Sequence, residues 1–278
     1  MAVEFQVLGP VEMWHCGDRV DLGHAKQRCV LAVLLMESGE VVQVATLIDR
    51  VWGYSPPETA LNVLYGYIAR LRRALAPAGV RLARRAGGYL LDVDPRRVDV
   101  HRFRGLLGEA DAAEEVDPAV RCLSDALALW RGAPFAGITG PWITTMRTVL
   151  EDQRLSAIVA RNNLFLCTGR HAEVVSQLLE LVAAYPVDER LVAQLMLAMS
   201  RSGRPSDALA QYRIARDRLR EQHGTDPGPL LRDLQQRILH DDHTGSASFV
   251  RAVRSLLIKT TPRTTSQPRT TSHRLHAI

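Results

Sequence analysis

The sequence predicts a mainly α-helical protein. An N-terminal winged helix-turn-helix of α+β type precedes an all-α domain of tetratricopeptide-like helical repeats. Three observations predict this fold. Short strands and three helices precede a glycine-containing hairpin within the first 95 residues. From Asp99 onward the chain reads as helix after helix, and a Gly-Arg motif recurs there. We therefore expect domains at residues 1–95 and 96–240, followed by a basic, largely disordered tail at 241–278.

The composition is that of a globular protein without catalytic or membrane signatures. The 278 residues carry a formal net charge of +5, which suggests a polyanionic partner. Its four cysteines lack metal-ligand spacing, so we expect no metal and no cofactor. There is no Walker loop and no GxSxG motif, so we expect no enzyme. The apolar stretch 29–36 is too short to span a bilayer, and no signal peptide opens the chain, so we expect a cytoplasmic protein.

The first elements are predicted from periodicity and turn residues. Residues 3–8, 11–15 and 19–22 read as a small antiparallel β unit. A helix is predicted over 25–37 and ends at Ser38-Gly39. Its apolar positions lie on one side, at Val30, Leu31, Leu34 and Leu35. A second short helix is predicted over 44–52, stopped at Gly53.

The third helix has the clearest pattern in the chain. The segment 55–59 is a start signal, because Pro57 suits a first helical turn and Glu58 complements the helix N-terminus. The helix is predicted to run to about Ala76. Five apolar residues recur at helical spacing and predict one buried stripe: Leu61, Leu64, Ile68, Leu71 and Leu75.

The side of this helix opposite the stripe carries the chemistry of a groove reader. Asparagine can pair with adenine, valine can touch a thymine methyl group, and glycine lets the backbone approach closely. We assign base contacts to Thr59, Asn62, Val63 and Gly66. We assign phosphate contacts to Arg70, Arg72 and Arg73. The alternative for any single arginine is an ordinary solvated helix face.

A basic hairpin is predicted to follow the third helix. Residues 80–93 alternate with period two around Gly87-Gly88, which places Arg84 and Arg85 near the tip. Residues 59–91 contain six arginines and no acidic residue. We expect Arg84 and Arg85 to contact phosphates or the minor groove, rather than only to make the hairpin soluble.

An internal repeat marks the helical region. Gly169-Arg170 and Gly203-Arg204 begin similar segments that are 34 residues apart, the tetratricopeptide period. Each pair is predicted to lie in the turn of a helical hairpin. Such repeats present concave binding surfaces, so an alternative function is a protein-interaction or ligand-sensing scaffold with weak or no DNA binding.

Long segments of the chain closely resemble a known family. The residues that carry the match include DLGHAKQRCVLAVLLMESGE, LIDRVWGYSPPETALNVLYGYIARLRRAL, RFRGLLGEA, ALALWRGAPF and LAMSRSGRPSDALAQYRIARDRLREQHGTDPGPLLRDLQQRIL. They resemble the DNA-binding and bacterial transcriptional activator domains of the Streptomyces antibiotic regulatory proteins, over about residues 3–240. This sequence departs from the family pattern at His24, Tyr65 and Ala69.

The resemblance implies a function as well as a fold. Members look like activators of secondary-metabolite gene clusters. They are similar in their reader to the OmpR-type winged helix, and bind direct repeats in double-stranded promoter DNA as a pair of subunits. The loop made of Gly53, Tyr54, Ser55, Pro56 and Pro57 resembles one that contacts RNA polymerase. Neither a receiver domain nor an ATPase module is expected. The operator and the regulated pathway are not implied.

Overall fold

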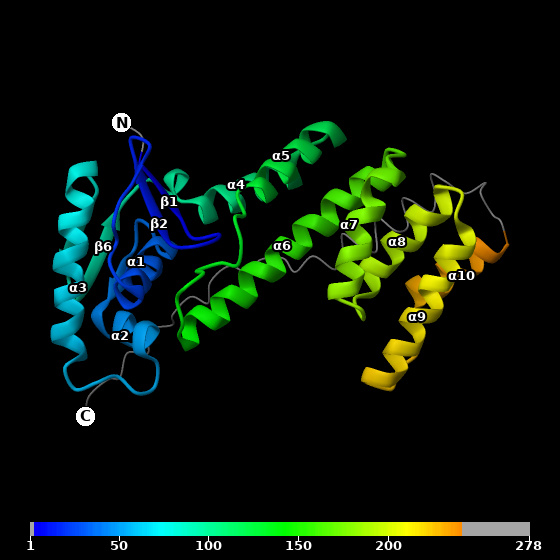
Figure 1. Cartoon of the computed structure of the whole chain (residues 1–278). Helices are drawn as coiled ribbons and strands as arrows, with labels where there is room; N and C mark the ends of the chain where they lie inside the picture. Colours follow the sequence, from blue (N-terminus) through cyan, green and yellow to red (C-terminus); the bar gives the residue numbers. More distant parts are fainter. Residues whose placement is uncertain (1–2, 241–278) are drawn as a thin grey trace, which may run out of the picture. The chain divides into compact units, whose positions relative to one another are not determined.

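The computed structural model describes residues 3–240, and the tail predicted at 241–278 lies outside them. The chain divides into two compact units, Met1–Leu164 and Phe165–Ile278. The first unit contains the predicted winged helix-turn-helix, and Figure 1 shows its elements in blue to green.

The chain begins with a small antiparallel sheet, as predicted. Strands β1 (Val3–Gln6), β2 (Glu12–His15) and β3 (Asp18–Arg19) follow in the order β1-β2-β3. Phe5 on β1 is paired with Met13 on β2, and both side chains are buried. The strands are shorter than the apolar runs suggested, because Val7, Leu8 and Val11 belong to the connection and still reach the core.

Three helices follow, and the first is the centre of the unit. They are α1 (Ala25–Met36), α2 (Val44–Trp52) and α3 (Ala60–Leu75). The expectation that α1 is apolar on one side only was too narrow. Every residue from Cys29 to Met36 is buried, because α1 is covered on all sides. A helix that is apolar all round is typical of a buried position.

A second three-stranded sheet forms the predicted wing. Strands β5 (Arg81–Arg85) and β6 (Gly88–Asp92) form the hairpin, and β4 (Val41–Gln43) pairs with β6, in the order β4-β6-β5. β4 has only three residues and was not predicted, since so short a segment has no readable period. The turn is Ala86-Gly87, with a φ of 74° at Gly87.

Two 3-10 turns and seven further helices complete the described part of the chain. A 3-10 turn at Ala76–Ala78 follows α3, and another at Pro95–Arg97 follows the wing. The first unit continues with α4 (Asp99–Ala112), α5 (Val116–Ala128) and most of α6 (Pro141–Cys167). The second unit contains α7 (His171–Ala184), α8 (Glu189–Arg201), α9 (Pro205–His223) and α10 (Pro229–Leu239).

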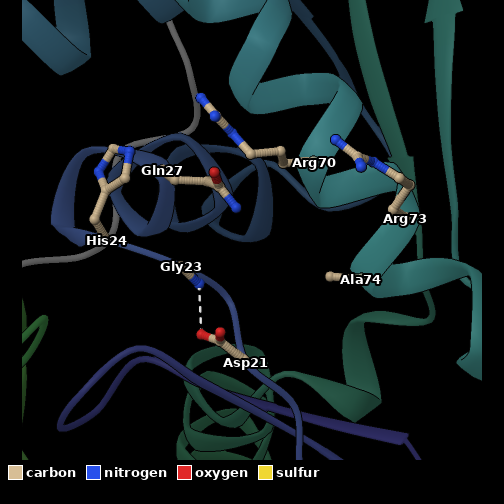
Figure 2. Close-up of a pocket in the computed structure, with 7 residues that line it drawn as sticks. All are labelled: Asp21, Gly23, His24, Gln27, Arg70, Arg73 and Ala74. Atoms are coloured by element: carbon tan, nitrogen blue, oxygen red, sulfur yellow. Dashed lines mark hydrogen bonds between the residues drawn. The ribbon is translucent and has the colours of Figure 1, made fainter.

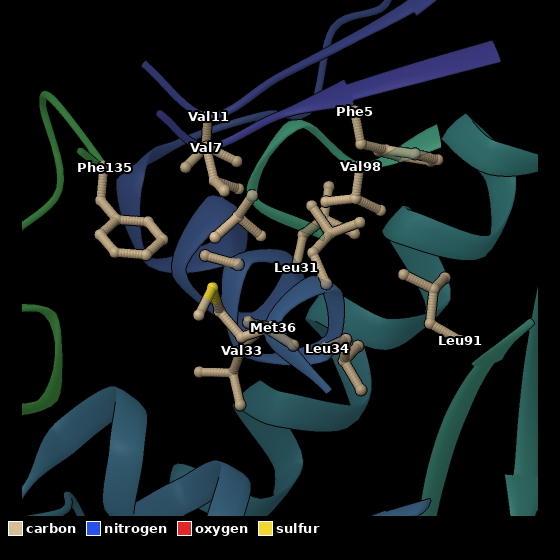
Figure 3. Packing of buried hydrophobic residues seen from close by; sticks show 14 of the residues in the cluster. Phe5, Val7, Val11, Leu31, Val33, Leu34, Met36, Leu91, Val98 and Phe135 are labelled. Carbon is tan, nitrogen blue, oxygen red and sulfur yellow. The ribbon is translucent and has the colours of Figure 1, made fainter. Parts of the chain in front are cut away.

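One hydrophobic core joins the winged helix to the first helices beyond residue 95. Figure 3 shows Phe5, Leu31 and Leu91 in the same cluster as Val98 and Phe135. The compact unit therefore ends near residue 164, whereas the sequence suggested a domain boundary after residue 95. The physical reason is that residues 98–150 supply buried side chains to the core of the N-terminal segment.

Asp99, at the start of α4, fastens the N-terminal sheet to this shared core. Its carboxylate accepts hydrogen bonds from the amides of Val7 and Leu8, at 2.9 and 3.0 Å. The guanidinium of Arg131 lies 3.3 Å from the same carboxylate and also pairs with Glu12 at 3.4 Å. Burial raises the pKa of the Asp99 carboxyl, opposed by the two amides and by Arg131.

The two Gly-Arg motifs occupy equivalent turns, as predicted. Gly169 and Gly203 have φ angles of 81° and 77°, and the next residue's amide donates to a helix carbonyl at 2.9 Å in both turns. Arg170 pairs with Glu173 at 2.6 Å, and Arg204 pairs with Asp207 at 2.7 Å. The 34-residue repeat in the sequence is therefore a repeat of turn geometry.

Candidate nucleic-acid interface

Helix α3 presents two distinct sides. Leu64, Ile68, Leu71 and Leu75 are at most 1% exposed, which confirms most of the predicted stripe. The prediction was wrong for Leu61, which is 42% exposed. The buried side of α3 instead includes Ala60 and Tyr67, and at 100° per residue this puts Leu61 at the edge of that side.

The start of α3 also differs from the prediction. The helix begins at Ala60, whose amide donates to the carbonyl of Pro57 at 2.8 Å, so residues 57–59 form a turn before it. Thr59 is the N-cap residue and its side chain makes no capping hydrogen bond. The hydroxyl of Thr59 is therefore exposed at the N-terminal end of α3.

The predicted base-reading residues share the exposed side of α3. Thr59 and Asn62 are exposed, and Val63 and Gly66 are half-buried. A Cβ atom added at Gly66 would meet only the tip of Arg70, at 3.5 Å. The backbone at Gly66 is thus open toward any molecule that approaches this side.

The three predicted phosphate contacts are not equivalent. All three are exposed, and none of them forms an ion pair within residues 3–240. Arg72 differs because it faces the wing, where its Nε donates to the carbonyl of Leu82 at 2.8 Å. Its guanidinium also lies over Tyr89, 5.5 Å from the ring centroid. Arg72 therefore ties α3 to the hairpin.

The wing brings its basic residues beside α3. Arg84 lies over the ring of Tyr65 on α3, 5.8 Å from the centroid. Arg84 and Arg85 are both exposed in the last residues of β5, next to the turn. The close approach of the β6 strand to β4 requires a glycine at position 88, since a Cβ there would collide with the backbone of Val42.

The loop between α2 and α3 holds the residues 53–57. Gly53 closes α2 with a φ of 69°, and its amide donates to the carbonyl of Asp49 at 2.6 Å. Tyr54 is 99% exposed, and Ser55, Pro56 and Pro57 are also exposed. The Tyr54 side chain is therefore open to solvent and is not part of the core.

A pocket of about 350 Å³ lies between the start of α1 and the C-terminal half of α3. Figure 2 shows its lining, which is Asp21, Gly23, His24, Gln27, Arg70, Arg73 and Ala74. The sequence did not predict that residues 21–27 lie beside α3, because they precede Arg70 by more than 40 residues. His24 was noted only as a departure from the family pattern.

Within residues 3–240, no group of three or more His, Cys, Asp or Glu side chains is arranged to hold a metal ion. No helix in that range has the length and apolar character needed to cross a membrane. Burial raises the pKa of the Cys29 thiol in α1 to about 11, which is typical of an unreactive core cysteine.

The chain matches two protein families. The family described as "Bacterial transcriptional activator domain" matches residues 98–239, and the family described as "Transcriptional regulatory protein, C terminal" matches residues 17–91. The second match covers α1 to α3 and most of the wing. Together, the two matches include every residue of the candidate interface described above.

Several curated proteins are similar over most of this chain. The regulatory protein AfsR of Streptomyces coelicolor is 41% identical over 87% of this chain, which spans only 24% of AfsR. The transcriptional regulator RedD of the same species is 38% identical, and 71% of RedD is covered. The regulatory protein DnrI of Streptomyces peucetius is 37% identical over 86% of this chain and 93% of DnrI.

A solved structure has the same fold. It is that of Mycobacterium tuberculosis EmbR in complex with a low-affinity phosphopeptide. EmbR is 31% identical and superposes with a TM-score of 0.83, over 92% of this chain and 69% of the EmbR chain.

Proposed function

This chain belongs to the family of Streptomyces antibiotic regulatory proteins, and from that premise we propose that it is a sequence-specific DNA-binding activator of transcription. Its target in this proposal is the promoter DNA of a secondary-metabolite gene cluster. Two copies bind direct repeats near a promoter and recruit RNA polymerase. The work is done in the cytoplasm, where the chromosome lies.

One observation carries the proposal. The exposed side of α3 and the adjoining wing form a surface with arginines and one asparagine, and residues 59–91 contain no acidic side chain. A helix of this size fits the major groove of B-form DNA. The arginines neutralise phosphates, while Asn62 and its neighbours face the base edges.

The wing and the loop complete the proposed assembly. Arg84 and Arg85 stand at the hairpin tip, where they reach the backbone or the minor groove beside the major-groove helix. Tyr54, in the loop 53–57, is exposed on the same compact unit and is proposed to contact RNA polymerase.

The experiment is a mobility shift with the full chain on a duplex that the chain itself selects from a random pool. We expect one preferred sequence, containing a direct repeat, bound with an affinity that falls steeply with salt. The log–log slope should be roughly −0.9 for each neutralised phosphate. Transcription in vitro from a promoter carrying that sequence should rise when the chain is added.

The scaffold alternative makes the opposite forecast. Selection of no sequence, or salt-insensitive retention of every duplex alike, would contradict the proposal. A stoichiometric protein partner recovered by pull-down without DNA would then favour a role for the helical repeats as a scaffold.

A further inference from the structure

We propose that the pocket between the start of α1 and the C-terminal half of α3 is a seat for one backbone phosphate of the bound DNA. This inference rests on the proposed function and adds a contact to it, centred on His24 and Arg70. The seat lies on the flank of α3 that faces away from the wing.

The position of the pocket follows from the geometry of α3. An α-helix turns by about 100° per residue, so Arg70 and Ala74 lie on one flank of the exposed side, and Tyr65 and Arg72 lie on the other. The second flank faces the wing, since Tyr65 contacts Arg84 and Arg72 bonds to Leu82. The pocket lies along the first flank, where Arg70 and Ala74 are among its lining residues.

The lining has the charge that a phosphate requires. Arg70 and Arg73 line the pocket from α3, and His24, the residue before α1, lines it from the opposite side (Figure 2). Asp21 is the one carboxylate among the lining residues, and its Oδ1 accepts the amide hydrogen of Gly23 at 2.8 Å. The hydrogen bond holds one oxygen of Asp21 in place, and the negative charge of Asp21 opposes an anion in the pocket, where two arginines outnumber it.

A row of aromatic rings holds His24 and Arg70 in place. The imidazole of His24 meets the edge of the Tyr67 ring at a centroid distance of 5.0 Å. Tyr67 in turn stacks on Trp52 at 6.2 Å with nearly parallel planes, and the guanidinium of Arg70 lies 5.4 Å from the centroid of Tyr67. Tyr67 is only 8% exposed, so the row is anchored in the core and positions both His24 and Arg70.

The exposed side of α3 has an arginine on each flank, which suits the two phosphate backbones that border the major groove of DNA. The major groove is bounded by one phosphate backbone on each side, and a helix lying in it has a backbone next to each flank. On the wing flank, Arg84 over Tyr65 reaches one backbone. On the pocket flank, His24 and Arg70 beside Tyr67 reach the other.

The test uses the full chain and a duplex selected by the wild type from a random pool. In a set of otherwise identical duplexes, one phosphate at a time is replaced by an uncharged methylphosphonate. We expect a position at which this replacement weakens binding by the wild type but has no further effect on Arg70→Ala. The magnitude of the salt slope should fall by roughly one in that variant.

Two other variants probe the same seat. His24→Ala should weaken binding by about 2- to 10-fold, the loss of one hydrogen bond. Asp21→Asn should tighten binding to all duplexes. The matched control is Arg121→Ala, which removes an exposed arginine of α5. This variant should change neither the affinity for the unmodified duplex nor the position at which a methylphosphonate weakens binding. Thermal unfolding of each variant checks that the fold is intact.

Three outcomes separate this inference from the proposed function. If Arg70→Ala and His24→Ala retain the full methylphosphonate pattern while the wild type still selects a sequence, the seat is wrong and the function stands. Saturable binding of inorganic phosphate by the DNA-free chain at matched ionic strength, with that pattern retained, would likewise assign the pocket to a free ligand and overturn the inference. If the wild type selects no sequence, the proposed function itself fails.

Discussion

The Nε atom of Arg72 on α3 donates a hydrogen bond to the carbonyl oxygen of Leu82 on β5, at 2.8 Å. Its guanidinium lies over Tyr89 of the other wing strand, β6. This one side chain therefore joins the proposed recognition helix to both strands of the wing. Among the described residues, its neighbour Arg73 has the same charge and no contact of this kind with the wing, so the two residues form a matched pair for experiment.

Replacing Arg72 by Ala should destabilise the first unit, since it removes the hydrogen bond to Leu82 and the contact with Tyr89. We expect a loss of about 1–2 kcal/mol in the free energy of unfolding. Arg73→Ala should leave that free energy within about 0.5 kcal/mol, yet weaken binding to all DNA sequences alike. Urea unfolding measures the free energy of unfolding of each variant, and mobility shifts at several salt concentrations measure its affinity for DNA. Equal stability of the two variants would contradict the bracing role of Arg72.

Asn62 should set sequence preference. Asn62→Ala should reduce discrimination between the selected duplex and one with a changed base pair by about 1–3 kcal/mol. The measurement is the ratio of dissociation constants for the two duplexes, with Arg73→Ala as the control that weakens both. A variant that loses affinity for both duplexes in the same proportion would assign Asn62 to the backbone instead.

Replacing Gly66 by alanine should preserve the stability of the fold but weaken DNA binding. Gly66→Ala should raise the free energy of unfolding by up to about 1 kcal/mol, because alanine favours a helix and the added Cβ meets only Arg70. In the proposed complex the same Cβ stands where the backbone of α3 faces the major groove, so affinity for DNA should fall. Gly105→Ala on α4 is the control, since nothing lies within 4 Å of its added Cβ and DNA binding should not change. Unchanged binding by Gly66→Ala would remove Gly66 from the interface.

Tyr54 should separate DNA binding from activation. Tyr54→Ala removes a side chain that is 99% exposed, so stability and DNA affinity should be preserved. Activated transcription in vitro should nevertheless decrease, while Asn62→Ala should lower both the binding and the transcription. Full activation by Tyr54→Ala would exclude this tyrosine from the contact with RNA polymerase.

Asp99 should give the first unit a pH-dependent stability. Burial raises the pKa of this carboxyl, so the folded chain holds the proton more tightly than the unfolded chain. The contribution of Asp99 is therefore most favourable below the ordinary aspartate pKa of about 3.9, and it decreases as the pH rises toward the raised value. Above that value it no longer changes.

The measurement compares the wild type with Asp99→Asn by urea unfolding across this pH range. The free energy of unfolding of the wild type, minus that of the variant, should decrease as the pH rises. At neutral pH, Asp99→Ala should cost about 2–4 kcal/mol, because the buried amides of Val7 and Leu8 lose their acceptor. A pH-independent difference between the wild type and Asp99→Asn would contradict the raised pKa.

Local chemistry made much of this protein readable from its sequence. The spacing of Leu64, Ile68, Leu71 and Leu75 determines the inner side of α3, because a helix repeats every 3.6 residues whatever surrounds it. The Gly-Arg turns and the hairpin with Gly87 are equally local, since positive φ angles and short loops need glycine. From these patterns come the fold class and the residues of the proposed DNA-reading face.

Tertiary packing decided the rest. Leu61 is exposed and not part of the buried stripe, Arg72 contacts the wing, and His24 lies beside Tyr67 of α3. Asp99 joined the N-terminal sheet across 92 positions of the chain. Periodicity records which residues share a side of an element, but it carries no information about which other element covers that side. Only the packed chain fixes those partners, because burial and hydrogen bonding between distant segments depend on how all of them fit together.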